Sequence, residues 1–537
     1  MKKLKAIVPV AFLTASLVAC QNGGNNGAAS SADGSGQSKP SDASLNLSMA
    51  LMGGAKTPNS WTEKALEEDL TKALGKPVAL ESVFLPGWED AQTKINLNMS
   101  DKSTMPDIQW WYGMDKEYTN WVKSGALVDL VPYLQKHGKT ILNYYSPETM
   151  FYSYEKGKMY RLPGDVAEAT SMTTIIRKDW LDKLGLKVPT TVDEYIEVLR
   201  AFTKRDPDGN GKDDTYGLSG PGIAGSAEYR TFAPIFFAYK SIPNEFMVQA
   251  DGTVKYGAVL PQTKEALKVL QSMYKEGLID PRTISNTDAN KFEEIAASGK
   301  VGSFYRWIAY FNPSSTLYKS FKANNPSGEL LAIPPVKGPD GFSSDYPEAV
   351  GGWCFIGVTS KTKDPAGAVQ ALNRIASPET FKLVSFGKEG EHYKIENGQF
   401  QSLLTPDEQN KLGIGNYTWY LSRKDEANIS NIPQVIDLFK KGEATSKPLR
   451  ELVVRFKTND RPAFKEYIKD IEKVRDEVFY GIISGKKSID EFDKFVDKYY
   501  AMGGKKVEEE ANALYKAQKQ EYAEFLTWYD KEIKPYK

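Results

Sequence analysis

Cysteine and histidine are scarce in this sequence of 537 residues, which contains two of each. The histidines are His137 and His392, and no H-E-x-x-H, G-x-S-x-G or Walker A motif occurs. Catalysis by a histidine-dependent or nucleotide-dependent site is therefore unsupported. A carboxylate pair for glycoside hydrolysis stays open, because its required separation is spatial and 69 acidic residues offer many pairs.

Only one cysteine lies in the body of the chain. Cys354 stands in the apolar stretch Gly352–Ile356, and a nucleophilic role would need an activating base close in space. A chain of this length with 41% hydrophobic residues can form a large core without disulfides. We expect a buried thiol.

A basic surplus and a second long apolar run are also missing. Lysine and arginine total 69, and so do aspartate and glutamate, so nothing favours a nucleic-acid partner or an anionic membrane surface. Beyond the N-terminus no apolar run approaches the roughly 20 residues of a transmembrane helix. We expect no nucleic-acid binding and no membrane-spanning helix in the body.

The N-terminus has the layout of an export signal. Three lysines precede the apolar run Ala6–Val18, which is too short for a permanent membrane span. Leu17–Cys20 resembles a bacterial lipobox, which implies cleavage before Cys20 and diacylglyceryl attachment to its sulfur. The alternative is an ordinary signal peptide with an incidental cysteine.

A polar stretch follows the lipobox. Residues 21–44 contain no Ile, Leu, Val, Phe, Tyr or Trp, so they cannot form a core. At random-coil dimensions such a tether spans about 25–30 Å. We therefore predict a signal peptide at 1–19, a lipidated Cys20 with a flexible tether over 20–44, and a body held at the extracellular face of the cell membrane.

The body begins with alternating strand and helix patterns. Strands are predicted over 45–52, 78–84 and 108–111, with helices near 61–74 and 88–99 between them. This alternation predicts an α/β domain with a largely parallel sheet. The alternation resumes after Pro163, and the last hundred residues are rich in Lys and Glu with helical apolar spacing.

The segment Asp206–Asp214 has the ligand spacing of a calcium loop. Oxygen-bearing side chains fall at positions 1, 3, 5 and 9, with Gly211 at the sharp-turn position. Position 12 is Gly217, where an EF-hand has its bidentate glutamate. The alternative is a polar turn without metal. We predict structural Ca²⁺, held by Asp206, Asp208, Asn210, the carbonyl of Lys212, and Asp214.

Aromatic side chains gather at predicted strand ends and in loops. In an open α/β sheet, loops beyond the carboxyl ends of strands line the ligand crevice, where flat rings can stack on sugars. The alternative for each tryptophan is a place in the core. The predicted ligand-binding residues are Trp61, Trp111, Tyr112, Asp165, Arg306, Trp307 and Trp353.

Several segments together resemble the family 1 extracellular solute-binding lipoproteins of carbohydrate ABC importers, especially their long Gram-positive branch. They are Leu17–Cys20, Ile176–Leu186 with Pro189–Thr191, Asp206–Gly217, Gly387–Tyr393 and Glu491–Phe495. In similar proteins, side chains that match Asp206, Asp208, Asn210 and Asp214 bind Ca²⁺, together with the carbonyl that matches Lys212.

The resemblance implies a two-lobe periplasmic-binding-protein-like (type II) fold with discontinuous lobes, hinge crossings and a helical C-terminal extension. One lobe would comprise 45–163 with 350–420, and the other 166–348 with 421–537. Crossings are expected near Leu162–Asp165, near Tyr346–Gly352 and after Gly415.

The resulting functional hypothesis is a non-enzymatic, monomeric lipoprotein. It would capture an oligosaccharide between its lobes and deliver it to ABC permease subunits, with the bilayer as a further partner through acylated Cys20. The alternatives are a lipid-anchored glycan-active enzyme, a binding protein for peptides or other solutes, and an accessory protein that presents ligand to a membrane sensor.

Overall fold

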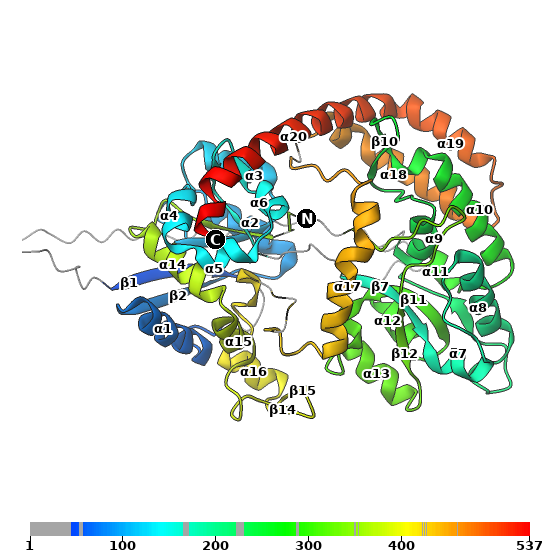
Figure 1. Cartoon of the computed structure of the whole chain (residues 1–537), viewed down its shortest axis with the longest axis horizontal. Coiled ribbons are helices and arrows are strands. Elements are labelled where there is room, and N and C mark those ends of the chain that lie inside the picture. The colour runs from blue at the N-terminus through cyan, green and yellow to red at the C-terminus, as the bar shows by residue number, and fades with distance from the viewer. Residues whose placement is uncertain are drawn as a thin grey trace, which may run out of the picture. The chain divides into compact units, whose positions relative to one another are not determined.

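The structure is a computed structural model (Figure 1), and its described residues are 44–52, 57–164, 171–221, 230–285, 289–347, 351–352, 354–421, 423, 425, 427–458 and 460–537. The predicted signal peptide, Cys20 and the tether up to residue 43 lie outside these residues. Asp165 and Trp353 also lie outside them.

The first sheet has five strands in the order β2-β1-β3-β13-β6. β1 pairs in parallel with β2 and β3, as the sequence predicts, whereas β13 runs antiparallel to both β3 and β6. Because β13 enters after some 190 intervening residues, the chain returns to a sheet that it had left. The strands are β1 (Leu45–Leu51), β2 (Val78–Phe84), β3 (Ile108–Tyr112), β6 (Leu162–Pro163) and β13 (Cys354–Val358).

Capping hydrogen bonds account for the point at which the first helix begins. Ser60 accepts a hydrogen bond from the amide of Glu63 at 3.2 Å, and the Glu63 carboxylate accepts one from the amide of Asn59 at 3.0 Å. Gly75 ends the helix with φ +66°, a conformation that glycine adopts without a side-chain penalty. The helices of this part are α1 (Trp61–Leu74), α2 (Trp88–Asn98), α3 (Asp115–Lys123), α4 (Val131–His137), α5 (Lys139–Tyr144), α6 (Pro147–Phe151), α14 (Pro365–Ile375), α15 (Pro378–Phe386) and α16 (Pro406–Leu412).

The second sheet has four strands in the order β12-β7-β11-β8. β7 pairs antiparallel with β11 and β12, and β11 pairs in parallel with β8. The strands are β7 (Met172–Arg177), β8 (Tyr216–Leu218), β11 (Val301–Trp307) and β12 (Leu330–Ile333). The helices of this part are α7 (Lys178–Leu184), α8 (Val192–Lys204), α9 (Ala233–Ala238), α10 (Pro261–Lys275), α11 (Arg282–Ser285), α12 (Ala289–Ala297) and α13 (Thr316–Asn324).

Short hairpins and a helical C-terminal region complete the chain. The hairpins are β4 (Tyr154–Glu155) with β5 (Lys158–Met159), β9 (Phe246–Val248) with β10 (Val254–Tyr256), and β14 (Tyr393–Glu396) with β15 (Gln399–Ser402). The C-terminal helices are α17 (Pro433–Arg450), α18 (Pro462–Ile483), α19 (Glu491–Tyr499) and α20 (Lys505–Glu532). None of the helices in the described part of the chain has the length and apolarity that a membrane crossing requires.

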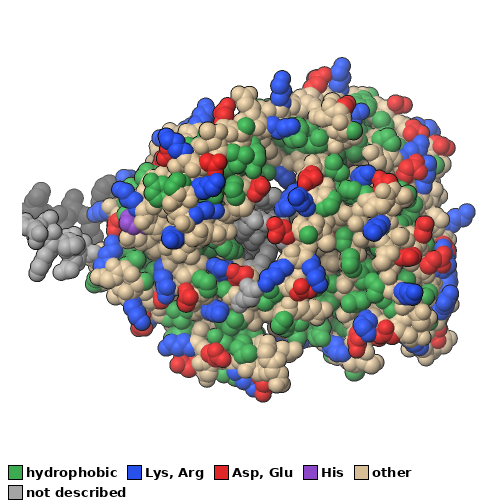
Figure 2. All heavy atoms as spheres, in the orientation of Figure 1, with side chains coloured by type: hydrophobic (Ala, Val, Ile, Leu, Met, Phe, Trp, Pro, Cys, Tyr) green, Lys and Arg blue, Asp and Glu red, His purple; other side chains and the backbone are tan. Residues whose placement is uncertain are grey.

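Each sheet has its own hydrophobic core. The cluster on the first sheet draws on residues 45–162 and 354–421, and it includes Cys354, which is fully buried. The main cluster on the second sheet draws on residues 172–336 and 449–511. Helix α20 contributes to both, with Val507 in the second cluster and Phe525 in the first. Acidic and basic side chains are interspersed over the visible face (Figure 2).

Candidate functional site

Two adjoining cavities lie where residues of the first sheet's part of the chain meet β9, the segment 454–464 and α20. We name them the basic cavity, of about 510 Å³, and the helix-side cavity, also of about 510 Å³. Asp115, Arg161 and Lys457 line both of them, so the two cavities join at these side chains. The further charged or aromatic residues of the basic cavity are Tyr112, Tyr152, Glu245, Phe246, Phe355, Arg455, Phe456, Arg461 and Phe464.

Arg161 forms the wall that the two cavities share. Its guanidinium donates to Asp115 Oδ1 at 3.3 Å and to the carbonyl of Tyr152 at 2.8 Å. It also lies 4.0 Å from the ring centre of Phe355 and 4.2 Å from that of Tyr118. The side chain is 4% exposed, so these contacts hold a nearly buried positive charge in place.

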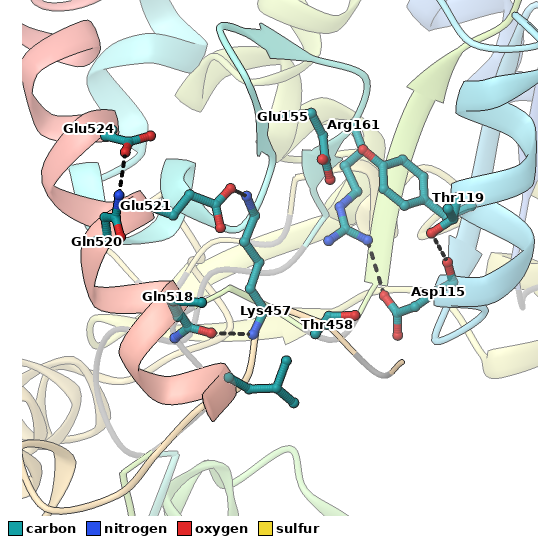
Figure 3. A pocket seen from close by; sticks show the side chains of 13 residues that line it. Asp115, Thr119, Glu155, Arg161, Lys457, Thr458, Gln518, Gln520, Glu521 and Glu524 are labelled. Atoms are coloured by element: carbon teal, nitrogen blue, oxygen red, sulfur yellow. Dashed lines mark hydrogen bonds and ion pairs between the residues drawn. The ribbon is translucent and has the colours of Figure 1, made fainter. Parts of the chain in front are cut away.

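Lys457 joins the cavities to helix α20. Its ammonium contacts Glu521 Oε1 at 2.5 Å and donates to the carbonyl of Tyr154. Figure 3 shows Lys457 extending toward Glu521 on α20, with Arg161 and Asp115 beside it. The helix-side cavity also contains Glu155 and Glu524, so acidic groups predominate on that side.

Arg455 and Glu245 form a second ion pair in the basic cavity. The pair is 2.5 Å long, and Arg455 also donates to the carbonyl of Pro347 at 2.7 Å. Burial opposes the charge of Arg455, but Glu245 outweighs it and holds the pKa of this guanidinium above its usual value. Arg455 therefore connects the segment that follows α17 with Pro347, which lies in the crossing predicted near Tyr346–Gly352.

Arg461 lies 4.0 Å from the ring centre of Phe464 and 4.9 Å from that of Phe456. Within the described part of the chain, its guanidinium has no ion pair and its Nε has no hydrogen-bond partner. Burial lowers the pKa of Arg461 from its usual value. The basic cavity thus contains four cationic side chains, Arg161, Arg455, Lys457 and Arg461, against Asp115 and Glu245.

Of the ligand residues predicted from the sequence, Tyr112 lines the basic cavity. Trp111 is 0% exposed and packs against Tyr118, Trp121 and Phe355, because its strand position points it into the core. A ring enclosed in this way offers no face to a ligand, and we leave Trp111 out of the proposed site.

Three other predicted ligand residues are not among those lining the two cavities in the described part of the chain. Trp61 packs edge-on against His392 with 4.2 Å between ring centres. Arg306 is 7% exposed and pairs with Glu293 at 3.2 Å. Trp307 ends β11 and packs against the second sheet's main cluster.

The basic side chains of the cavity are not among the ligand residues predicted from the sequence. Arg161 and the segment Arg455–Arg461 are almost 300 residues apart, so no local pattern joins them. The alternation of basic and aromatic residues in Arg455-Phe456-Lys457 was the available signal. Position at a strand end does not indicate these residues, because Arg455–Arg461 belongs to neither sheet.

The predicted calcium loop folds around Asp206. Its carboxylate accepts hydrogen bonds from the amides of Gly209 and Gly211, both at 3.0 Å, which lower the pKa of Asp206. The Asn210 side chain accepts from the amide of Lys212 at 2.7 Å. Both glycines have φ +74°, which favours glycine at these turns.

Two carboxylates of the loop converge on one lysine. The Lys300 ammonium lies 2.7 Å from Asp208 Oδ2 and 2.9 Å from Asp214 Oδ2, and it lowers the pKa of Asp214. Among the described residues, no group of three His, Cys, Asp or Glu side chains is arranged as a metal site. Asp208 and Asp214 already face a positive charge, that of the Lys300 ammonium.

The comparisons with known proteins establish the family. Residues 54–380 match the model of the bacterial extracellular solute-binding proteins, so the chain belongs to this family, as its motifs predict. The chain is 25% identical over 491 residues to lipoprotein LipO of Bacillus subtilis, covering 87% of this chain and 92% of LipO.

Two further relatives are named for the sugars that they bind. The polygalacturonan/rhamnogalacturonan-binding protein YtcQ of Bacillus subtilis is 26% identical over 363 residues, which is 64% of this chain and 68% of YtcQ. The fructooligosaccharide ABC transporter substrate-binding protein FusA of Streptococcus pneumoniae is 28% identical over 313 residues, which is 55% of this chain and 56% of FusA.

Solved structures confirm the predicted two-lobe solute-binding fold. An EF-hand mutant of FusA in complex with fructo-nystose has a TM-score of 0.57 at 21% identity, covering 88% of this chain and 99% of that one. Solute-binding proteins of Bifidobacterium longum share the fold with TM-scores of 0.66 and 0.65. The existence of an EF-hand mutant of FusA indicates that this relative has an EF-hand-type site.

Proposed function

We propose that this protein is the substrate-binding lipoprotein of an ABC importer and that it captures an oligosaccharide in the two adjoining cavities. The single observation that carries the proposal is the composition of the basic cavity, where aromatic rings and charged side chains from two parts of the chain face one space. Rings stack on the apolar faces of sugars while charged groups bond the hydroxyls. The names of YtcQ and FusA support a sugar ligand.

The proposed mechanism is closure of the lobes on the ligand. Tyr112, Tyr152 and Phe355 approach the cavity from the first sheet's part of the chain, and Phe456 and Phe464 approach it from the segment beyond α17. A sugar that contacts both groups favours the state in which they are closest. No bond of the ligand is made or broken, and the permease subunits receive it unchanged.

The proposed location is the extracellular face of the cell membrane, with acylated Cys20 as the lipid anchor. The match to lipoprotein LipO and the extracellular family support it. We also propose Ca²⁺ as a structural ion bound by Asp206, Asp208, Asn210, Asp214 and the carbonyl of Lys212. The hard oxygen chemistry of this loop supports the ion, which would displace the ammonium of Lys300 from Asp208 and Asp214.

The test is a binding panel on the mature protein. Neutral oligosaccharides, acidic oligosaccharides and peptides of matched length are compared by thermal shift and calorimetry, and small-angle scattering is recorded with each binder. We expect a sugar to raise the melting temperature and to reduce the radius of gyration. If no sugar in the panel binds while a peptide does, the proposed function is wrong.

A further inference from the structure

The guanidinium of Arg461 is a cation in the basic cavity that no described carboxylate neutralises. In the described part of the chain it forms no ion pair, and its Nε is buried without a hydrogen-bond partner. A half-buried charge of this kind is costly unless an anion accompanies it. The other three basic residues of the cavity differ, since Arg161, Arg455 and Lys457 each contact a carboxylate.

The two carboxylates that act on Arg461 are already engaged elsewhere. Glu245 pairs with Arg455 at 2.5 Å. Glu510 accepts hydrogen bonds from the amides of Ala463 and Phe464, both at 2.9 Å, at the start of α18. Neither can turn to Arg461 without losing a partner, so the guanidinium is placed to receive an anion from a ligand.

The position of Arg461 suits a sugar that carries the anion. Phe464 and Phe456 lie against its guanidinium, 4.0 Å and 4.9 Å from their ring centres, and both rings also line the cavity. A planar guanidinium binds a carboxylate through two parallel hydrogen bonds. Aromatic rings beside it offer a surface for the apolar face of the same sugar ring.

We propose that the oligosaccharide is acidic and that Arg461 binds the carboxylate of one of its uronate units in the basic cavity. This inference depends on the proposed function, because it specifies the ligand of the same site. It also assigns an orientation: the uronate lies at the Arg461 end, while neutral or hydroxyl-rich units extend toward Asp115, Glu155 and Glu524 in the helix-side cavity.

The decisive probes are oligosaccharides of two to six units that carry a single terminal uronate, and the same oligosaccharides after chemical reduction of that carboxylate to a primary alcohol. Linkage and ring shape are kept, and only the charge is removed. We expect calorimetry to give an affinity for the acidic set that is on the order of tenfold to a hundredfold higher, as for a charge-assisted pair. Added salt should weaken only the acidic set.

Variants assign the effect to the residue. Arg461→Gln should remove the preference for the acidic set, and Arg461→Lys, which keeps the charge but loses the planar fork, should retain part of it. Arg205→Gln is the matched control, because Arg205 is exposed at the end of α8 and the variant loses the same charge. Its affinities should equal those of the unchanged protein, and melting curves check that all three variants are folded.

Three results would overturn the inference. Equal binding of acidic and reduced sets would do so and leave the proposed function standing. Tighter binding of sulfated neutral oligosaccharides than of uronates would show that the anion bound by Arg461 is a sulfate and not a carboxylate. Failure of all sugars, with peptide binding retained, would overturn both the inference and the proposed function.

Discussion

Val507 and Phe525 stand on one helix, α20, yet they belong to the hydrophobic clusters of two different sheets. They are 18 residues apart in the sequence, which corresponds to about 27 Å along the helix axis. Figure 1 shows α20, in orange to red, running from the elements near α18 and α19 to those near α6. The helix therefore links the two cores directly, in addition to the segments that cross between the sheets.

Because α20 links the two cores, substitution of a buried residue near its C-terminal end should strongly lower the stability of the protein. Phe525 is 0% exposed and packs against Phe151, Tyr154 and Tyr529. Phe525→Ala should lower the free energy of unfolding by about 3–5 kcal/mol, because it leaves a cavity among aromatic rings. Urea unfolding measures the change. The neighbouring Leu526 is 37% exposed, and Leu526→Ala should change stability by no more than about 0.5 kcal/mol.

The cavity assignment predicts that three aromatic residues respond differently to substitution. Tyr112→Ala should weaken binding of the sugar identified in the panel by about tenfold, since one ring of the basic cavity is lost. Trp61→Ala and Trp307→Ala should leave the dissociation constant unchanged, because neither residue lines either cavity. Calorimetry on folded variants distinguishes the outcomes. Equal losses in all three would contradict the location of the site.

The contact of Lys300 with Asp208 and Asp214 predicts the calcium response. Adding Ca²⁺ to the metal-stripped protein should raise the melting temperature, and Lys300→Met should reach half of its maximal gain at a roughly tenfold lower calcium concentration. The reason is that Lys300 occupies Asp208 and Asp214 as a competing cation. Asp214→Asn should reduce the response. A chelator that leaves the melting temperature of the unchanged protein unaltered would exclude the structural ion.

Asp345 predicts a pH dependence of stability. It is 4% exposed and accepts a hydrogen bond from Thr445 at 2.7 Å, and burial raises its pKa from 3.8 to about 7. Between these values the folded protein holds a proton that the unfolded chain has released, so the stability contribution of this group falls as pH rises from about 4 to 7. The loss is at most roughly 4 kcal/mol.

Asp345→Asn provides the comparison. The amide resembles the protonated acid, so the variant should be more stable than the unchanged protein at pH 8 and close to it at pH 4. Urea midpoints at both values measure the difference. If the two proteins differ in stability by the same amount at pH 4 and at pH 8, Asp345 does not titrate as its burial predicts.

Much of the architecture follows from local patterns. Ser60 and Glu63 mark the start of α1 and Gly75 marks its end, as capping chemistry predicts. The first three strands and their parallel pairing follow from alternation with helices. The loop at Asp206 also folds as its glycines and oxygen side chains indicate.

The ligand surface could not be predicted in the same way. Trp111 and Tyr112 are neighbours in the sequence with similar side chains, but packing on both faces of β3 buries Trp110 and Trp111, whereas Tyr112 at the end of the strand reaches the basic cavity. Trp111 is enclosed by Tyr118, Trp121 and Phe355, of which Phe355 lies some 240 residues later and pairs with Trp111 in the sheet. Neither propensity nor spacing contains that information.

Residues that lie close together in the chain were enough to specify the family, the alternating α/β plan and the spacing of oxygen side chains in the loop at Asp206–Asp214. The pairing of charges, in contrast, emerged only from the folded chain. Three cations form ion pairs: Arg161 with Asp115, Arg455 with Glu245, and Lys457 with Glu521. Arg461 has no ion pair with a carboxylate among the described residues. The physical reason is that ion pairing depends on distances of a few ångströms in space, which chain segments hundreds of residues apart acquire only when both sheets have formed.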